Sequence, residues 1–387
     1  MIALVQPFGI HSPGGGPRIL RSLLDDAPAP FVSVCTSLRR PDDFDASYEV
    51  HLPIRPYLGL VEHTRLSGPL SVLTRLAAPW FKQRLRALFK ERGVTRVHAI
   101  PHGLDFWYAF EVTREMDLPY VLTVHDDMTY NLHDRVYLAE AMQRLATVWR
   151  ESDGRMVISD AMGRAYNERY GKRPYAVVTD GLTDVAPDVR PREPGRLNVY
   201  FMGSVHLSYE ANFQSMLDAL DRVARRRPDQ NVRLTVRGGM PFDLREGAAP
   251  LDVLGWGTQD DIEADLAEAD LLYFPLPFAS EHDAFVRYSL STKMVTYLGS
   301  GRPILYHGPD VAAAARLLDT NDAGLLACTN DVDTLASIVT SVDPDHLDAI
   351  TRGGLRLARN QFLLLDQRRR FWSRLAPDAT LTATVTA

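Results

Sequence analysis

Short apolar runs alternate with longer amphipathic segments along this chain, and that alternation leaves few folds open to it. Most of the runs are apolar throughout, which is typical of parallel strands covered on both faces. Strand–helix alternation of this kind predicts an α/β protein with doubly wound parallel sheets. The strands are expected at Ile2–Gln6, Phe31–Cys35, Arg96–Ile100, Tyr120–Val124, Arg155–Ile158, Ala176–Thr179, Leu197–Met202, Arg233–Arg237, Leu251–Leu254, Leu271–Pro275, Pro303–Tyr306 and Gly324–Ala327.

The pattern restarts after a polar stretch that contains prolines, Pro187–Arg196. A restart predicts two similar domains, and 387 residues suit two domains of ordinary size. Ligands of such folds bind beyond the carboxyl ends of the strands, so the expected site is a central cleft that the two domains face. We expect a first domain over 1–186, a second over 187–362, a C-terminal helix over 363–377 that returns to the first domain, and a disordered tail over 378–387.

Composition excludes several classes of protein. A net charge of -6 argues against a general nucleic-acid binder. Cys35 and Cys328 are too few for a disulfide framework or a zinc site made of cysteine pairs, which favours a reducing, cytoplasmic location. Met1–Ile10 is interpreted as a first strand and not as a signal peptide. No apolar stretch reaches the roughly 18 residues of a membrane-spanning helix, so we expect at most peripheral membrane contact.

A glycine-rich loop follows the first strand. Gly15 and Gly16 would let backbone amides approach a phosphate at the start of a helix, with Arg18 close behind. The loop matches neither the dinucleotide-binding nor the P-loop pattern. We predict a ligand-binding loop, and the alternative is a flexible turn.

The strand 120–124 ends at His125, Asp126 and Asp127. A side chain at the carboxyl edge of a parallel sheet faces the ligand side, and a neutral imidazole can hydrogen-bond a hydroxyl or a phosphate. The alternative is that His125 closes a loop and an aspartate caps the next helix. The three residues lack the further ligands that a metal site requires.

The second half carries two further candidates. Gly203 and Ser204 follow a strand, and their backbone amides are expected to face a diphosphate. Ser291, Thr292 and Lys293 stand where a helix should begin. A lysine in a first turn opposes the helix dipole unless an anion is bound there, so we predict a phosphate site. The alternative is a plain capping cluster with an exposed lysine.

A basic segment, Arg75–Arg92, also has apolar residues at helical spacing. A membrane-surface role is one interpretation. The favoured interpretation is a helix packed on the sheet with a solvated basic face. Loops around His63, His102 and Trp107 are candidates for an acceptor pocket.

These motifs, in this order, resemble glycosyltransferase family 4 over nearly the whole chain. Leu118–Asp126 is similar to that family's strand ending in His-Asp, and Asp153–Ser159 to the stretch before its interdomain linker. Gly255–Gly257 and the segment up to Pro275 resemble a further family segment. Ser291–Ile304 is the most similar piece and resembles the donor-binding helix.

The resemblance implies the GT-B architecture and transfer of a sugar from a nucleotide-sugar to an acceptor hydroxyl, with retention of configuration. It implies no obligatory metal and no cofactor, because the nucleotide-sugar is a substrate. It implies that His125 contacts the donor and that the Gly14–Gly16 loop and Ser291–Lys293 hold the diphosphate. The residues that it places near the nucleotide or the phosphates include Arg237, Gly238, Gly239, Trp256, Gly257 and Thr296.

The chain departs from this family at one motif. Tyr288 and Thr296 stand where the family has a pair of glutamates, and Asp126, Glu281 and Asp283 are the carboxylates that are candidates for donor-sugar contacts. Two alternative functions therefore stay open. One is a nucleotide-sugar epimerase of the same shape, which needs carboxylates as acid and base. The other is a non-catalytic relative that acts as a partner protein.

Overall fold

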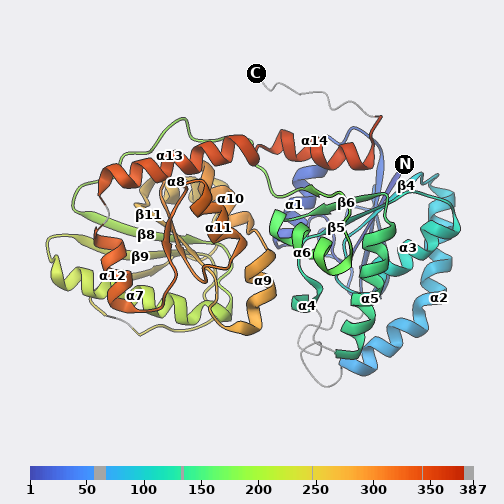
Figure 1. Cartoon of the computed structure of the whole chain (residues 1–387), viewed down its shortest axis with the longest axis horizontal. Helices are drawn as coiled ribbons and strands as arrows, with labels where there is room; N and C mark the ends of the chain where they lie inside the picture. The colour runs from blue at the N-terminus through green and yellow to red at the C-terminus, as the bar shows by residue number, and fades with distance from the viewer. Residues whose placement is uncertain (56–66, 132–134, 246, 342, 379–387) are drawn as a thin grey trace. The chain divides into compact units, whose positions relative to one another are not determined.

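The computed structural model describes residues 1–55, 67–131, 135–245, 247–341 and 343–378 (Figure 1). The prediction about His63, and residues 379–387 of the predicted tail over 378–387, lie outside the described residues. The chain divides into two compact units, and each is described by itself. Unit 1 combines residues 1–181 with the C-terminal segment from Leu364, and unit 2 is Leu182–Leu363.

Unit 1 is built on a seven-stranded sheet in the order β3-β2-β1-β4-β5-β6-β7, with every neighbouring pair parallel. All residues of β1 and β5 are buried, as expected of strands that are covered on both faces. The strands are β1 Ile2–Gln6, β2 Phe31–Ser37, β3 Glu49–Arg55, β4 Arg96–Ala99, β5 Tyr120–Val124, β6 Gly154–Val157 and β7 Ala176–Val177. The helices are α1 Gly15–Leu24, α2 Ser67–Glu91, α3 Asp105–Glu115, α4 Met128–Asn131, α5 Arg135–Glu151, α6 Asp160–Tyr170 and α14 Leu364–Leu375.

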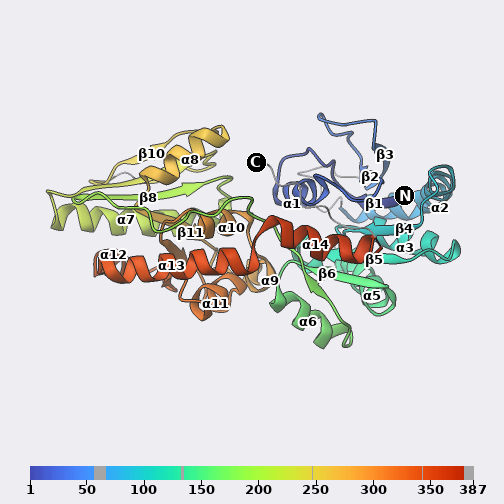
Figure 2. The ribbon, with the colours of Figure 1, turned by 90° about the horizontal axis from the view of Figure 1, so that it is seen from above.

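The last helix, α14, belongs to unit 1, where it packs on α1, β4 and β6. The indole of Trp372 donates a hydrogen bond to the carbonyl of Leu23 at 2.9 Å. Arg368 forms ion pairs with Asp25 at 2.9 Å and with Asp26 at 3.4 Å, just beyond α1. A helix distant in sequence therefore completes the first unit, and Figure 2 shows α14 from above.

Unit 2 repeats the design with a six-stranded parallel sheet in the order β10-β9-β8-β11-β12-β13. Its strands are β8 Arg196–Met202, β9 Asn231–Arg237, β10 Leu251–Val253, β11 Leu271–Pro275, β12 Ile304–His307 and β13 Leu325–Ala327. Its helices are α7 Glu210–Arg226, α8 Gln259–Glu268, α9 Asp283–Tyr288, α10 Thr292–Gly299, α11 Ala313–Thr320, α12 Val332–Ser341 and α13 Pro344–Gln361.

Successive residues of β8 serve two separate cores. Val199 and Phe201 pack in one cluster, whereas Tyr200 and Met202 pack in the other. The side chains of a strand point alternately to opposite faces, so the two clusters are the two sides of one sheet. The predicted doubly wound α/β architecture is confirmed in both units.

The strand β3 was not predicted from the sequence. β3 pairs in parallel with β2 at the edge of the unit 1 sheet. Leu52 and Ile54 are buried, while His51 and Pro53 between them are only half-buried. Alternation and an internal proline fit an edge strand and conceal it from a search for continuous apolar runs.

The junction between the units falls at Gly181, five residues before the predicted residue 186. Leu182 already belongs to unit 2, since its N–H donates to the carbonyl of Phe362 at 2.7 Å. Further along, the N–H groups of Ala186 and Arg190 donate to the carbonyls of Gly299 and Gly301. The segment after the junction is therefore bound to the loop that follows α10.

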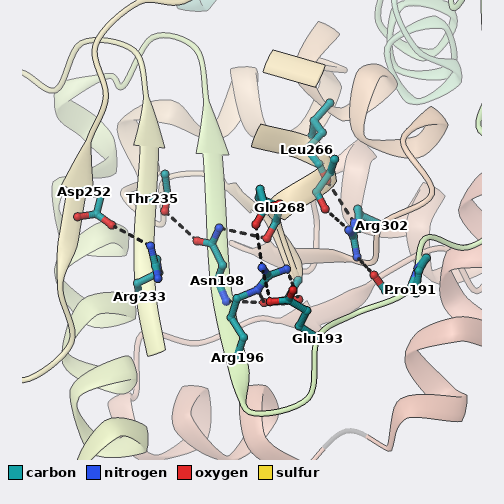
Figure 3. Close-up of polar contacts among 12 residues, drawn as sticks. Pro191, Glu193, Arg196, Asn198, Arg233, Thr235, Asp252, Leu266, Glu268 and Arg302 are labelled. Atoms are coloured by element: carbon teal, nitrogen blue, oxygen red, sulfur yellow. Dashed lines mark hydrogen bonds and ion pairs between the residues drawn. The ribbon is translucent and has the colours of Figure 1, made fainter. Parts of the chain in front are cut away.

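Arg302 anchors the same segment at the amino end of the unit 2 sheet (Figure 3). Its buried guanidinium donates to the carbonyls of Leu266 and Pro191, at 3.2 and 2.9 Å. Nearby, Arg196 forms ion pairs with Asp270 and Glu268. Arg302 belongs to the motif that resembles a donor-binding helix, yet its contacts are those of a structural residue.

Candidate functional site

Two glycines bring the carboxyl ends of β8 and β9 together in unit 2. The N–H of Gly203 donates to the carbonyl of Arg237 at 2.8 Å. A Cβ on Gly238 would lie 2.3 Å from the carbonyl oxygen of Gly203. Both glycines have positive φ, 98° and 132°. A side chain at Gly238 would clash with backbone, so this close approach requires glycine.

Lys293 lies beside these glycines, in the first turn of α10. Its Nζ is 3.5 Å from the ring centroid of Phe201 in β8. A Cβ on Gly203 would be 3.4 Å from Lys293 Cε and 3.8 Å from Nζ. Within the described part of the chain, no carboxylate pairs with this ammonium group. Burial lowers the pKa of Lys293 to about 7.

An unpaired, half-buried lysine at a helix start is costly on two counts. Desolvation disfavours its charge, and the helix dipole repels it. An anion bound at the same place removes both costs, because it pairs with the ammonium and is attracted by the positive end of the helix dipole. Lys293 is half-buried, unlike the exposed lysine of the alternative interpretation, whereas Ser291 caps the helix as that interpretation expects.

Two of the hydroxyl groups predicted around Lys293, those of Ser291 and Thr296, have local partners. Ser291 is the N-cap of α10, and its Oγ accepts from the N–H of Lys293 at 3.3 Å. Thr296 donates to the carbonyl of Thr292 at 3.3 Å, as helical threonines often do. Ser204 is exposed, directly after Gly203. Ser291 keeps its hydroxyl hydrogen for a further acceptor, since the cap uses only its oxygen.

Arg237 is held by a carboxylate that the sequence analysis missed. Its Nε and Nη2 donate to the two oxygens of Asp265 in α8, at 2.6 and 2.9 Å. The hydroxyl of Tyr200 donates to the same carboxylate at 3.0 Å. Asp265 neutralises the charge of Arg237 and fixes its side chain. This arginine therefore lines the carboxyl edge of the unit 2 sheet and is not free to bind a phosphate.

The other predicted nucleotide residues surround Arg237. A Cβ on Gly257 would be 3.1 Å from Arg237 Cδ, and one on Gly239 would be 3.8 Å from the Nε1 of Trp256. The side chain of Trp256 is 71% exposed. Large aromatic groups are seldom left in water without a partner, and an exposed indole offers a flat face on which a base can stack. Unit 2 therefore gathers Gly203, Arg237, Gly238, Trp256, Gly257 and Lys293 at one edge.

Two histidines that the sequence analysis missed face each other at this edge. The rings of His206 and His282 are 6.3 Å apart in an edge-to-face arrangement. They follow β8 and β11, whose carboxyl ends are neighbours, and that is the signal that could have found them. Burial, and to a lesser degree His282, lowers the pKa of His206.

Two of the three carboxylates predicted to contact the donor sugar adjoin His282 in sequence. Glu281 is exposed and lies 3.5 Å from the Nε2 of His282. Asp283 opens α9 and forms an ion pair with Arg287 of the same helix, at 3.5 Å. Asp283 therefore has a salt-bridge partner within its own helix, and Glu281 adjoins a neighbouring imidazole.

Unit 1 brings its glycine loop and His125 together. α1 begins at Gly15, after Gly14 with a φ of 120°. A Cβ on Gly16 would be 3.4 Å from the Nδ1 of His125 and 3.3 Å from the ring of Phe8. His125 is buried, and its Nδ1 has no hydrogen-bond partner among the described residues. Burial lowers the pKa of His125 to about 4, so the imidazole is neutral at physiological pH.

The charged neighbours of this loop are already paired. Arg18 forms an ion pair with the buried carboxylate of Asp180 at 3.0 Å. The buried Asp127 accepts from the N–H of Thr129 and pairs with Arg169, which confirms the capping interpretation for that aspartate. Asp126, next to His125, is half-buried.

Of the predicted acceptor residues, His102 lies near the glycine loop. Its ring is 6.1 Å from that of Phe8, which also borders Gly16. Trp107 lies under the guanidinium of Arg144, 4.5 Å from the ring centroid.

No group of three or more His, Cys, Asp or Glu side chains in the described ranges could hold a metal ion. No described helix is long and apolar enough to cross a bilayer.

A family match covers part of the chain. Residues 196–342 match the family described as "Glycosyl transferases group 1". The matched segment lies within unit 2 and includes Gly203, Arg237 and Lys293. No curated protein matches the chain by sequence.

Solved structures share the fold along nearly the whole chain. HepE of Anabaena, in complex with UDP, has a TM-score of 0.67 and 14% identity, covering 97% of this chain and 99% of its own. Sucrose-phosphate synthase from Thermosynechococcus elongatus has a TM-score of 0.65 and 13% identity, covering 96% of each chain. A putative UDP-N-acetylglucosamine 2-epimerase from Listeria monocytogenes has a TM-score of 0.57 and 13% identity, covering 96% and 95%.

At these identities the likeness shows the fold and nothing more. Both units are Rossmann-like domains with parallel sheets, and together they match GT-B glycosyltransferases. The predicted GT-B fold is confirmed.

Proposed function

We propose that this protein is a glycosyltransferase that moves a sugar from a nucleotide diphosphate sugar to an acceptor hydroxyl, with retention of configuration. The family match of residues 196–342 supports glycosyl transfer. The GT-B fold supports a nucleotide-sugar as the donor, because HepE, a structure of the same fold, was solved with UDP.

The observation that carries the proposal is the unpaired ammonium of Lys293 next to Gly203. A diphosphate would supply the anionic partner that Lys293 lacks among the described residues. Gly203 leaves room for the side chain of Lys293, and Gly238 lets the ends of β8 and β9 approach each other, so both glycines shape the backbone around the ammonium group. Trp256 offers a flat face on which the nucleotide base can stack, and the side chain of Arg237 lies beside it, held by Asp265.

The chemical step needs little besides charge stabilisation. The bond between the anomeric carbon and the β-phosphate oxygen breaks, and the acceptor oxygen bonds to the same carbon on the same face. The acceptor proton passes to the departing phosphate oxygen, so no separate base is required. Lys293, the hydroxyls of Ser291 and Thr292 and the dipole of α10 would stabilise the negative charge of that phosphate. Neither a metal nor a cofactor enters this scheme.

In unit 1 we propose that His125 contacts the donor as a neutral hydrogen-bonding group. Its unpartnered Nδ1 and its buried, uncharged ring support this role. Gly15 and Gly16 would offer the N–H groups at the start of α1. Residues near Phe8, including His102, are candidates for acceptor contacts.

A binding screen on the full-length chain tests the proposal. Thermal unfolding is measured with UDP-, GDP- and ADP-sugars, and with UDP alone. A true ligand at about 100 times its dissociation constant should stabilise the protein by about 2.7 kcal/mol. The stabilising compound is then tested for sugar transfer. If none of these compounds stabilises the protein, the proposal is overturned.

An epimerase is the second candidate, because the chain shares its fold with a putative 2-epimerase. Incubating the stabilising donor without acceptor separates the two. An epimerase converts the donor by itself, whereas a transferase leaves the sugar unchanged. Binding without either reaction would favour the non-catalytic relative.

A further inference from the structure

Helix α2 carries an unusual outward face that the proposed function does not use. Large apolar side chains lie exposed along it: Leu76 is 72% exposed, Leu73 59% and Trp80 48%, with Val72 beside them. Residues four apart share one face of a helix, so Val72, Leu76 and Trp80 form a continuous stripe. We call Val72, Leu73, Leu76 and Trp80 the α2 stripe.

The opposite face of α2 is fully engaged. Phe81, Leu85 and Phe89 are buried in unit 1, and the helix packs on α3, α5 and β3. Burial of that face explains why the helix is held in place. It leaves the α2 stripe with no packing role of its own.

The basic residues of this segment divide into two groups. Arg75 pairs with Glu140 at 2.7 Å, Lys82 with Glu111 at 3.3 Å, and Arg86 with Glu115. These three ion pairs tie α2 to α5 and α3. Paired cations of this kind contribute nothing to the attraction of an outside anion.

The second group is exposed and makes no ion pair with the described residues: Arg84, Lys90 and Arg92. Arg84 lies over the ring of Trp80, 5.8 Å from its centroid, where the apolar stripe meets the basic end. Glu91 is the one exposed carboxylate between Arg84 and Arg92. Along α2 the outward face therefore passes from the apolar side chains to Arg84 and Lys90, with an indole at the boundary, and Arg92 follows directly after the helix ends at Glu91.

We propose that α2 binds the surface of a membrane that contains anionic phospholipid. In this arrangement the α2 stripe enters the boundary between headgroups and acyl chains, Trp80 lies at headgroup level, and Arg84, Lys90 and Arg92 contact lipid phosphates. The protein would bind peripherally, as a helix lying in the interface plane.

Charge favours a lipid surface over a second copy of this chain. In a two-fold symmetric dimer the same patch meets itself, which brings unpaired cations near unpaired cations. The chain has a net charge of -6, so the positive charge of these three unpaired cations is local to this part of the surface. Anionic lipid headgroups complement that local positive charge.

Vesicle flotation with the full-length protein tests this inference without any measurement of activity. Vesicles of phosphatidylcholine are compared with vesicles of phosphatidylcholine and phosphatidylglycerol. We expect binding to the mixed vesicles that weakens as salt is raised. Absence of binding to the mixed vesicles overturns the proposal.

Three variants locate the binding surface. The triple variant L73S/L76S/W80S should lose at least about tenfold in partition for each side chain removed. The variant R84Q/K90Q should lose roughly 30-fold on mixed vesicles and nothing on neutral ones. Leu365→Ser changes an exposed leucine on α14 of the same unit and should bind like the wild type.

Thermal unfolding checks that the variants fold. If the triple variant does not fold, the single variant Leu76→Ser is tested in its place. Unchanged vesicle binding by a folded stripe variant overturns the proposal. So does a concentration-dependent dimer that these substitutions disperse, because it would assign the stripe to a second copy.

Discussion

The ammonium nitrogen of Lys293 lies 3.5 Å from the ring centroid of Phe201, so a strand residue fixes the position of a helix residue. The ring faces a cation that has no carboxylate partner among the described residues. Aromatic faces attract cations, most strongly where water is excluded. Phe201 therefore holds Lys293 beside Gly203 without neutralising it, and leaves its charge for a ligand.

Replacing Lys293 with Met should lower turnover by about 10²–10³-fold, because one stabilising donor for the leaving phosphate is lost. Stability should not fall, since the apolar stem is kept and the poorly solvated charge is removed. Steady-state rates with the donor found by the binding screen provide the test. Lys172→Met, at an exposed lysine of unit 1, is the matched control. Normal turnover in K293M would exclude Lys293 from catalysis.

Donor affinity should depend on pH near neutrality. Burial lowers the pKa of Lys293 to about 7 in the free protein, and a bound diphosphate raises it again. The ligand binds the protonated form, so affinity is highest below pH 7. Above pH 7 it should fall by up to about tenfold per pH unit. Calorimetric titration of UDP across this range measures the effect, and K293M should show a flat profile if Lys293 is the cause.

Gly238→Ala should be much more harmful than Gly195→Ala. Both glycines have positive φ, so alanine is strained at either, by roughly 1 kcal/mol or more. At Gly195 the new Cβ meets no atom within 4 Å, whereas at Gly238 it meets the carbonyl oxygen of Gly203 at 2.3 Å. Urea unfolding should show the larger loss for G238A, with weaker donor binding in that variant alone. Equal losses would contradict the close approach.

Arg302→Met should destabilise unit 2 and leave turnover per folded molecule unchanged. The variant removes a charged donor from the buried carbonyl of Leu266 and from the part-buried carbonyl of Pro191. A loss of about 2–4 kcal/mol is expected, because each unsatisfied buried carbonyl costs about 1–3 kcal/mol. Urea unfolding measures the loss, and rates corrected for the folded fraction measure the second point. A fall in the corrected rate would assign Arg302 a part in donor binding.

Two buried histidines of unit 1 should behave in opposite ways. His125→Leu removes an unpartnered Nδ1, so it should lower turnover by about 10²-fold with little effect on stability. His98→Leu leaves the hydroxyl of Thr123 without its 2.6 Å partner, so it should cost about 1–3 kcal/mol and spare turnover. Rates and thermal unfolding on both variants decide the matter. Equal rates in the two would remove His125 from the site.

Continuous apolar runs were enough to predict most strands, because buried parallel strands leave that signal in the sequence. Leu271–Pro275 and Tyr120–Val124 have the predicted bounds. β3 was missed, since an edge strand with Pro53 obeys a different pattern. The predicted start of α10 follows from local chemistry, because Ser291 caps the helix through its own side chain.

The partners of the site residues could not be predicted from sequence. Asp265 is 28 residues from Arg237, and Phe201 is 92 residues from Lys293; only the register of β8 and the packing of α8 bring them together. One sequence motif includes both Lys293 and Arg302, and the sequence does not show that the first is a candidate site residue and the second a structural one. The structure separates them, with Lys293 at the carboxyl edge of the sheet and Arg302 at the amino end.

The return of α14 to unit 1 has a consequence for how the protein is made. Residues 1–181 lack the helix that covers Leu23 and pairs with Asp25 until Leu364–Leu375 has left the ribosome. Unit 2, a continuous segment, is synthesised in full before that moment. The nascent chain can thus finish its second unit first, and during that interval the first unit exposes apolar surface that a chaperone could recognise.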